Sequence, residues 1–159
     1  MNIAVNAPSV PETIYLKDYT PPVFAVQSVH LDIQVFDDHT IVVSQLEVER
    51  QHAGDLILLG RDLELKSISI DGVALTADQY TLDAEQLVIS NVPDRALIRT
   101  EVVIHPESNT QLEGLYQAAP DLFVTQNEPE GFRKITFYPD RPDVLSVFTT
   151  RVEADKKFP

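Results

Sequence analysis

A short polar run in the last third of the chain holds the side chains best suited to bind a ligand. Gln126 and Glu128 are two residues apart within Thr125-Gln126-Asn127-Glu128. If this run is extended, both side chains point to the same side, because side chains alternate along a strand. An amide and a carboxylate on one face form either a polar binding site or the solvated edge of a sheet, and the spacing alone leaves both open.

The histidines do not show the spacing of a metal site. They are separated by 9, 13 and 53 residues, at His30, His39, His52 and His105. Paired ligands need a two- or four-residue step to share one strand face or helix face. The chain also lacks His-Glu-x-x-His, the Gly-x-Ser-x-Gly elbow, and the glycine-rich loops that bind phosphates or dinucleotides. We therefore predict no catalytic residue and no metal ligand in this chain, with the histidines at surface or turn positions.

The composition excludes several classes of function. The 159 residues include 12 Lys+Arg and 25 Asp+Glu, a net charge of −13, and no Cys. A negative net charge repels nucleic acid and anionic lipid, so we expect neither as a partner. The lack of Cys rules out disulfides, thiolate metal sites and cysteine nucleophiles. No Lys or Arg precedes Lys17, and no early apolar run resembles a signal peptide or membrane span, so we expect a cytoplasmic protein.

Apolar residues recur with a period of two, the pattern of half-buried strands. Odd positions are apolar through Val29–Val35, and after Asp37-Asp38-His39 the alternation resumes over Val42–Glu49, which predicts a hairpin. Asp71-Gly72 is typical of a two-residue primed turn. Further strands are predicted at Leu56–Leu59, Lys66–Ile70, Tyr80–Leu82, Leu87–Ser90, Ile98–His105, Lys134–Tyr138 and Ser146–Glu153.

These elements predict an all-β domain. No window of 12 or more residues carries a convincing helical stripe, and many short strands at turn spacing favour an antiparallel, two-sheet, sandwich-like fold over residues 21–159. Residues 1–20, with Pro8 and Pro11, are expected to form an extended N-terminal arm.

Several ordered blocks resemble the N-terminal domain of the bacterial alanyl aminopeptidases in the M1 family of zinc metallopeptidases. The resemblance extends over residues 15–159. Its main blocks are Leu112-Glu113-Gly114-Leu115-Tyr116, Thr125-Gln126-x-Glu128-x-Glu130-Gly131-Phe132-Arg133 and Asp140-Arg141-Pro142-Asp143-Val144-Leu145, with Phe148-Thr149-Thr150 and Ala154-Asp155-Lys156 near the end.

The resemblance implies that chemistry and recognition are divided between domains. In the family, zinc and the catalytic residues belong to the next domain, so this chain alone should hold no cofactor and hydrolyse nothing. The family's N-terminal domain also continues with further strands, so the sandwich is expected to lack its last ones. By position, Glu128 corresponds to the carboxylate that binds the free α-amino group of a peptide, and Gln126 to the amide lining the first side-chain subsite. The implied partners are a peptide N-terminus and the enzyme's own catalytic domain.

Nearby charged residues are better explained as structural supports. Asp140, Arg141 and Asp143 are expected to form a capped turn with an arginine–carboxylate pair, and Glu130 and Arg133 to support the loop or a domain interface. An alternative reading of the whole chain is a non-catalytic interaction or scaffolding module. Carbohydrate binding by such a module is disfavoured by the absence of Trp, the usual stacking platform.

Overall fold

The computed structural model describes residues 13 and 15–158, and they form an almost entirely β domain. Their only helical elements are two 3₁₀ turns, η1 (Leu16–Asp18) and η2 (Phe132–Lys134). The strands are β1 (Phe24–Val35), β2 (Thr40–Arg50), β3 (Leu56–Leu59), β4 (Glu64–Ile70), β5 (Val73–Ala74), β6 (Tyr80–Leu82), β7 (Gln86–Ile89), β8 (Arg95–Ile104), β9 (Gly114–Ala119), β10 (Leu122–Gln126) and β11 (Val147–Ala154). The all-β prediction is confirmed. Most of the predicted arm, residues 1–12 and 14, lies outside the described residues.

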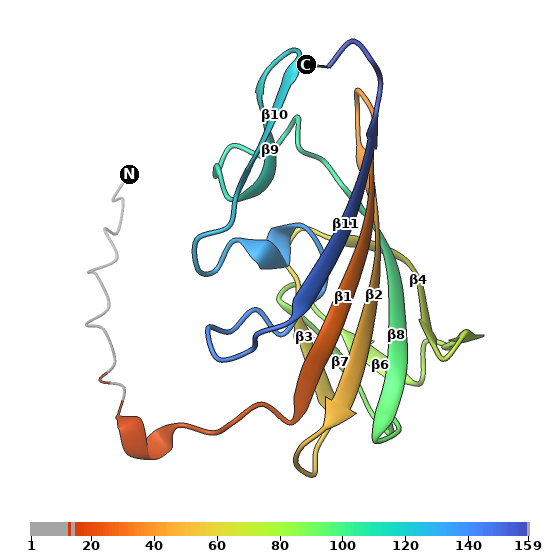
Figure 1. Cartoon of the computed structure of the whole chain (residues 1–159), viewed down its shortest axis with the longest axis vertical. Helices are drawn as coiled ribbons and strands as arrows, with labels where there is room; N and C mark the ends of the chain where they lie inside the picture. Colours follow the sequence, from red (N-terminus) through yellow and green to blue (C-terminus); the bar gives the residue numbers. More distant parts are fainter. Residues whose placement is uncertain (1–12, 14, 159) are drawn as a thin grey trace, which may run out of the picture.

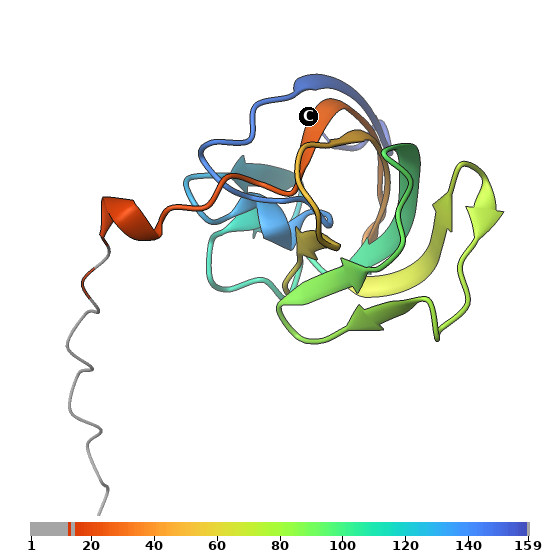
Figure 2. The same cartoon turned by 90° about the horizontal axis from the view of Figure 1, so that it is seen from below.

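The largest element is a six-stranded sheet in the order β11-β1-β2-β8-β4-β5. Figure 1 shows its long strands side by side, and Figure 2 shows the curve that they follow. All its neighbouring strands are antiparallel except β11, which runs parallel to β1 along one edge. A parallel edge strand was not part of the sequence-based prediction, because alternation reports which face is buried and carries no information on strand direction.

Two smaller sheets complete the fold. β3, β7 and β6 form an antiparallel three-stranded sheet, and β9 and β10 form a separate hairpin. Between them lies η2, which Figure 1 shows as a short blue coil below the β9–β10 hairpin. Four residues after η2 in the chain, Tyr138 forms a single antiparallel bridge with Leu59 at the end of β3. The segment around η2 therefore connects the hairpin to the three-stranded sheet.

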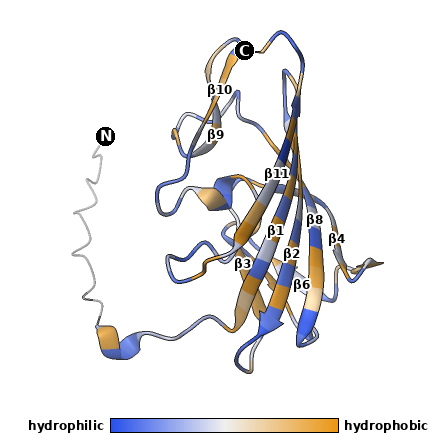
Figure 3. Cartoon of the chain, in the orientation of Figure 1, coloured by the Kyte–Doolittle hydropathy of each residue, from blue (hydrophilic) through white to orange (hydrophobic). Residues whose placement is uncertain are grey.

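The core lies between the large sheet and the three-stranded sheet. Alternate residues of β2 and β8 are buried, which is visible in Figure 3 as bands of opposite hydropathy along the strands. Leu46 and Ile98 from the large sheet, and Leu58 and Leu87 from the small sheet, are at most 1% exposed. Each side chain buried to this extent stabilises the fold by about 1.5–3 kcal/mol.

Two predicted turns are confirmed in detail. β1 and β2 form the expected hairpin, with Val35 opposite Thr40. Asp71 and Gly72 both have positive φ, 50° and 80°, and join β4 to β5 as a primed turn requires. The side chain of Asp71 also accepts a hydrogen bond from the Leu97 backbone N–H at 2.8 Å.

The predicted strand over Lys134–Tyr138 is wrong. This stretch contains the end of η2, a turn and the single bridge at Tyr138. The apolar residues Ile135 and Phe137 alternate as in a strand, but Thr136 between them is 0% exposed and Lys134 is also buried. Because the segment is enclosed on all sides, it has no solvent face for the alternation to mark.

Candidate functional site

The candidate site lies in a polar turn, which we define as residues 126–130. β10 ends at Gln126, opposite Gly114 of β9, and Glu128 lies in a bend two residues further on. All five residues of the polar turn are exposed. Because the strand stops at Gln126, the relative placement of the two side chains depends on the turn and not on strand alternation.

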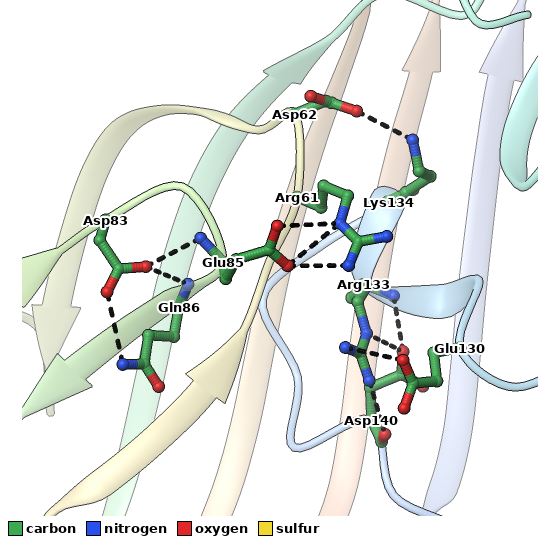
Figure 4. Close-up of polar contacts among 9 residues, drawn as sticks. All are labelled: Arg61, Asp62, Asp83, Glu85, Gln86, Glu130, Arg133, Lys134 and Asp140. Carbon is green, nitrogen blue, oxygen red and sulfur yellow. Dashed lines mark hydrogen bonds and ion pairs between the residues drawn. The ribbon is translucent and has the colours of Figure 1, made fainter. Parts of the chain in front are cut away.

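The polar turn leads directly into a buried stretch, the anchor segment, which we define as residues 131–139. Arg133 in η2 has only 8% of its side chain exposed. Its Nε donates to Asp140 Oδ2 at 2.9 Å, and its Nη1 lies 3.2 Å from Glu130 Oε2. Asp140 also accepts from the Arg133 backbone N–H at 3.2 Å (Figure 4). A buried guanidinium is stable only when it is paired in this way.

A second set of contacts holds η2 to the neighbouring loops. The backbone N–H of Arg61 donates to the Arg133 carbonyl at 2.9 Å. Two nitrogens of the Arg61 guanidinium, Nε and Nη2, donate to the Glu85 carboxylate at distances from 2.8 to 3.3 Å. Figure 4 shows Asp83 beside this pair, where it accepts from the backbone N–H groups of Glu85 and Gln86. The β6–β7 turn is thereby connected to η2.

Lys134 provides a further connection. Its side chain is 5% exposed, and Nζ lies 2.8 Å from Asp62 Oδ2, at the rim of the molecule where the Asp62 side chain is 72% exposed. The aliphatic stem is buried while the ammonium reaches toward the surface, the usual arrangement for a long basic side chain. The two consecutive basic residues of η2 therefore bind two different acidic loops.

The acidic residues from the polar turn to the following loop differ in their partners. Glu130 and Asp140 pair with Arg133, and Asp143 pairs with Arg141. Among the described residues, no cation and no hydrogen-bond donor side chain lies within bonding distance of the Glu128 carboxylate. Gln126 likewise makes no side-chain hydrogen bond to them. Glu128 is thus the one carboxylate of this stretch whose charge is not matched within the described part of the chain.

The loop after the anchor segment is closed by the expected arginine–carboxylate pair. Arg141 binds Asp143 through two nitrogens, at 2.8 and 2.6 Å, and also donates to the Thr20 carbonyl at 2.8 Å. The hydroxyl of Tyr19 donates to Asp143 at 2.9 Å. The bound guanidinium, helped by this hydroxyl, lowers the pKa of Asp143 from its ordinary 3.8 to about 2. These contacts fasten the end of the N-terminal arm, residues 19 and 20, to this loop.

The described residues do not bring metal ligands together. Within residues 13 and 15–158, no group of three or more His, Asp or Glu side chains is placed to hold an ion. His30 is exposed in the middle of β1, His52 and His105 are exposed in loops, and His39 stacks on Phe36 in the β1–β2 turn. In the same part of the chain, no helix has the length and apolar character needed to cross a bilayer.

Comparison with known families assigns this fold. The chain matches the Peptidase M1 N-terminal domain over residues 27–158. It belongs to the peptidase M1 family. The match covers the six-stranded sheet except the first three residues of β1, together with the hairpin, the polar turn and the anchor segment. The resemblance identified from the sequence blocks is therefore confirmed. We call the domain formed by this chain the M1 domain.

Three bacterial aminopeptidases are among the relatives of the M1 domain. It is 46% identical over 151 residues to aminopeptidase N of Caulobacter vibrioides and 41% identical over 152 residues to aminopeptidase N of Escherichia coli, each match covering 94% of the chain. The M1 domain spans 17% of the length of each relative. Aminopeptidase A of Legionella pneumophila, solved in complex with aspartic acid, superposes with a TM-score of 0.75 and 28% identity over 86% of this chain, and 17% of that chain is covered.

Sequence reasoning alone missed two contributors to this region of the M1 domain. Tyr19 was assigned to the extended N-terminal arm with no partner named for it, yet its hydroxyl donates to Asp143 across 124 positions of sequence. Gly131 was noted only as a member of a motif, yet its Cα lies against the backbone of the polar turn. For Gly131, the sequence offered one signal: a glycine follows a polar run but does not begin a recognisable turn.

Proposed function

We propose that this M1 domain recognises the free α-amino group of a peptide for a zinc-dependent aminopeptidase and forms one wall of its substrate cleft. In this proposal, the Glu128 carboxylate binds the ammonium group and Gln126 lines the subsite for the first side chain. Zinc and the hydrolytic residues would belong to the rest of the parent enzyme, which packs against this domain as its partner. The described residues of this chain do not offer a set of zinc ligands, so hydrolysis is not assigned to them.

One observation carries the proposal, namely the unmatched charge of Glu128. The other three carboxylates between residues 128 and 143 are held by arginines. An exposed carboxylate without an internal cation can accept one from outside, and its burial under a substrate would strengthen the attraction. At about 4 Å and an effective dielectric near 20, a carboxylate and an ammonium attract by about 4 kcal/mol before desolvation.

This charge suits an enzyme that removes residues from a chain end. A free N-terminus carries a positive charge, whereas an internal peptide bond carries none, so a fixed carboxylate selects the end of the chain. The Legionella relative is described in complex with aspartic acid, a molecule with a free α-amino group. The aminopeptidase names of the curated relatives support the same class of substrate.

The test is a charge-removing substitution in an active enzyme. This chain would replace the matching segment of Escherichia coli aminopeptidase N, with which it is 41% identical. In this chimaera, Glu128→Gln keeps the shape of the side chain and removes its charge. Because the lost attraction is partly offset by desolvation, we expect kcat/KM for an alanyl anilide to fall by at least about tenfold, equivalent to about 1.4 kcal/mol.

The control is a second exposed carboxylate on another part of the surface. Glu64 on β4 is paired with Lys66 and lies outside the polar turn, so Glu64→Gln should leave kcat/KM unchanged. Bound zinc should be equal in both variants and the parent chimaera. Equal kcat/KM for Glu128→Gln and the parent chimaera would remove the proposed role.

A further inference from the structure

The polar turn is folded back against its own strand at Gly131. The Gly131 N–H donates to the Glu128 carbonyl at 2.7 Å. A Cβ atom at Gly131 would lie 2.7 Å from the Gln126 carbonyl oxygen and 3.2 Å from the Glu128 carbonyl oxygen. Gly131 has φ −88°, which any residue can adopt. The requirement for glycine at this position is therefore one of space and not of backbone conformation.

A second glycine, Gly114, also lies in close contact with η2 and the end of the polar turn. Gly114 pairs with Gln126 between β9 and β10 and has φ +71°. A Cβ there would lie 2.7 Å from Lys134 Cβ and 3.2 Å from the Gly131 carbonyl oxygen. Three stretches of backbone, from β9, the polar turn and η2, therefore meet with no room for an intervening side chain.

Ion pairs and burial hold the anchor segment in place, so it cannot easily move to make room for a side chain at Gly131 or Gly114. Arg133 is held by Asp140 at 2.9 Å and by Glu130 at 3.2 Å, and Lys134 is held by Asp62 at 2.8 Å. Ile135, next in sequence, is 3% exposed in the core. A side chain added at Gly131 would consequently displace the exposed polar turn and not the buried segment beneath it.

We propose that Gly131 is a positioning residue for the Glu128 carboxylate, setting its location by allowing the polar turn to lie directly on η2. The Glu130–Arg133 ion pair also fixes the position of the polar turn, because it joins the turn to the buried guanidinium. This inference rests on the proposed role of Glu128 in binding an α-ammonium group. A displacement of about 1 Å in a positioning group can reduce an enzymatic rate about a hundredfold.

The test is a double-mutant cycle in the chimaeric aminopeptidase described above. Gly131→Ala alone should lower kcat/KM for an alanyl anilide by about tenfold or more, because the Cβ cannot be accommodated without moving the Gln126 and Glu128 carbonyls. In the Glu128→Gln background the same substitution should cost clearly less than in the parent chimaera, because the carboxylate it misplaces is already gone and only the displacement of Gln126 remains. A merely structural glycine would cost the same in both backgrounds.

Gly72→Ala is the matched control. Gly72 has φ +80° and open space around its Cα, so an alanine there is strained but touches nothing. It should lower the thermal unfolding midpoint of the chimaera and leave kcat/KM unchanged in both backgrounds.

A milder variant keeps the test decisive if Gly131→Ala does not fold. Glu130→Gln loosens the tie to Arg133 without adding volume, at a side chain that is 64% exposed. We expect it to lower kcat/KM by about threefold, and this loss should also disappear in the Glu128→Gln background.

The outcomes separate the two proposals. If Glu128→Gln lowers kcat/KM but Gly131→Ala and Glu130→Gln do not, the positioning role is overturned and the recognition role stands. If their losses persist in full in the Glu128→Gln background, the positioning role is overturned as well. If Glu128→Gln itself leaves kcat/KM unchanged, both proposals are removed together.

Discussion

The polar turn and the anchor segment are adjacent in sequence and rich in charge, yet they use charge in opposite ways. In the anchor segment, Arg133 and Lys134 are almost fully buried, and their guanidinium and ammonium groups are paired with acids outside the segment, at Glu130, Asp140 and Asp62. In the polar turn, Glu128 is exposed and unmatched among the described residues. The comparison teaches that a charge held by internal partners stabilises the fold, whereas one left without them is available to a ligand.

The comparison predicts its largest effect at Arg133. Arg133→Ala leaves Asp140, whose side chain is 14% exposed, without its main partner. We expect the free energy of unfolding to fall by about 3 kcal/mol, because removing one member of a buried pair leaves the other uncompensated. Urea denaturation of the 159-residue chain measures this.

Arg95 is the matched arginine on the surface. It pairs with Glu49 at 2.7 Å, but 80% of its side chain is exposed. Arg95→Ala should therefore cost less than about 1 kcal/mol. Equal losses for the two variants would show that burial does not distinguish the anchor segment.

A smaller effect is expected where the anchor segment packs on the small sheet. A Cβ at Gly60 would lie 2.4 Å from two ring carbons of Phe137, which is 1% exposed. Gly60→Ala should reduce the free energy of unfolding by about 1–3 kcal/mol through overpacking. In a Phe137→Leu background the penalty should shrink, because the obstructing ring is absent. If Gly60→Ala costs as much free energy of unfolding in the Phe137→Leu background as in the wild type, the clash does not involve the Phe137 ring.

Asp143 should show a pH-dependent effect that is smaller still. Its pKa is lowered to about 2 from 3.8, so its charge stabilises the folded state above about pH 4, and that contribution is lost as the pH falls through 2. Because the pair is partly exposed, Asp143→Asn should cost less than about 1 kcal/mol at neutral pH. The difference in unfolding free energy between wild type and Asp143→Asn should narrow on acidification, and a difference that widens would contradict the assignment.

The smallest effect on stability is predicted for Glu128 itself. Glu128→Gln changes an exposed side chain with no partner among the described residues, so the free energy of unfolding should stay within about 0.5 kcal/mol of wild type. Differential scanning calorimetry of the isolated chain measures this. A clear loss of stability would mean that the carboxylate has a structural partner, and would weaken the contrast with Arg133.

Much of the fold was predictable from local pattern. The β1–β2 hairpin and the Asp71-Gly72 turn follow from alternation and from the φ values that a primed turn needs, so short segments suffice to predict them. The Lys134–Tyr138 strand was predicted from the same alternation and was wrong, because burial on all sides depends on elements far away in sequence. Pattern analysis reports a boundary between core and solvent, and this segment has none.

The candidate site, like the fold, was predictable from the sequence only in part. Its residues, Gln126 and Glu128, are identified by type and by family resemblance, and their roles remain predictions. Their surroundings were visible only in part. The acidic partners of Arg133 lie three and seven positions away, and supporting roles for Glu130 and Arg133 were expected from the sequence. The contacts of Lys134 with Asp62 and Gly114 join segments far apart in the chain and depend on folding.

By itself, the sequence determined an acidic, cysteine-free β domain of the M1 family and where most of its strands lie along the chain, because these depend on composition and on neighbours a few residues apart. Only the tertiary structure decided which charges are matched internally. Ion pairs such as Lys134–Asp62 join residues 72 positions apart, and no local pattern encodes that distance. The same long-range packing leaves Glu128 exposed at the end of β10 while the residues that follow it enter the core.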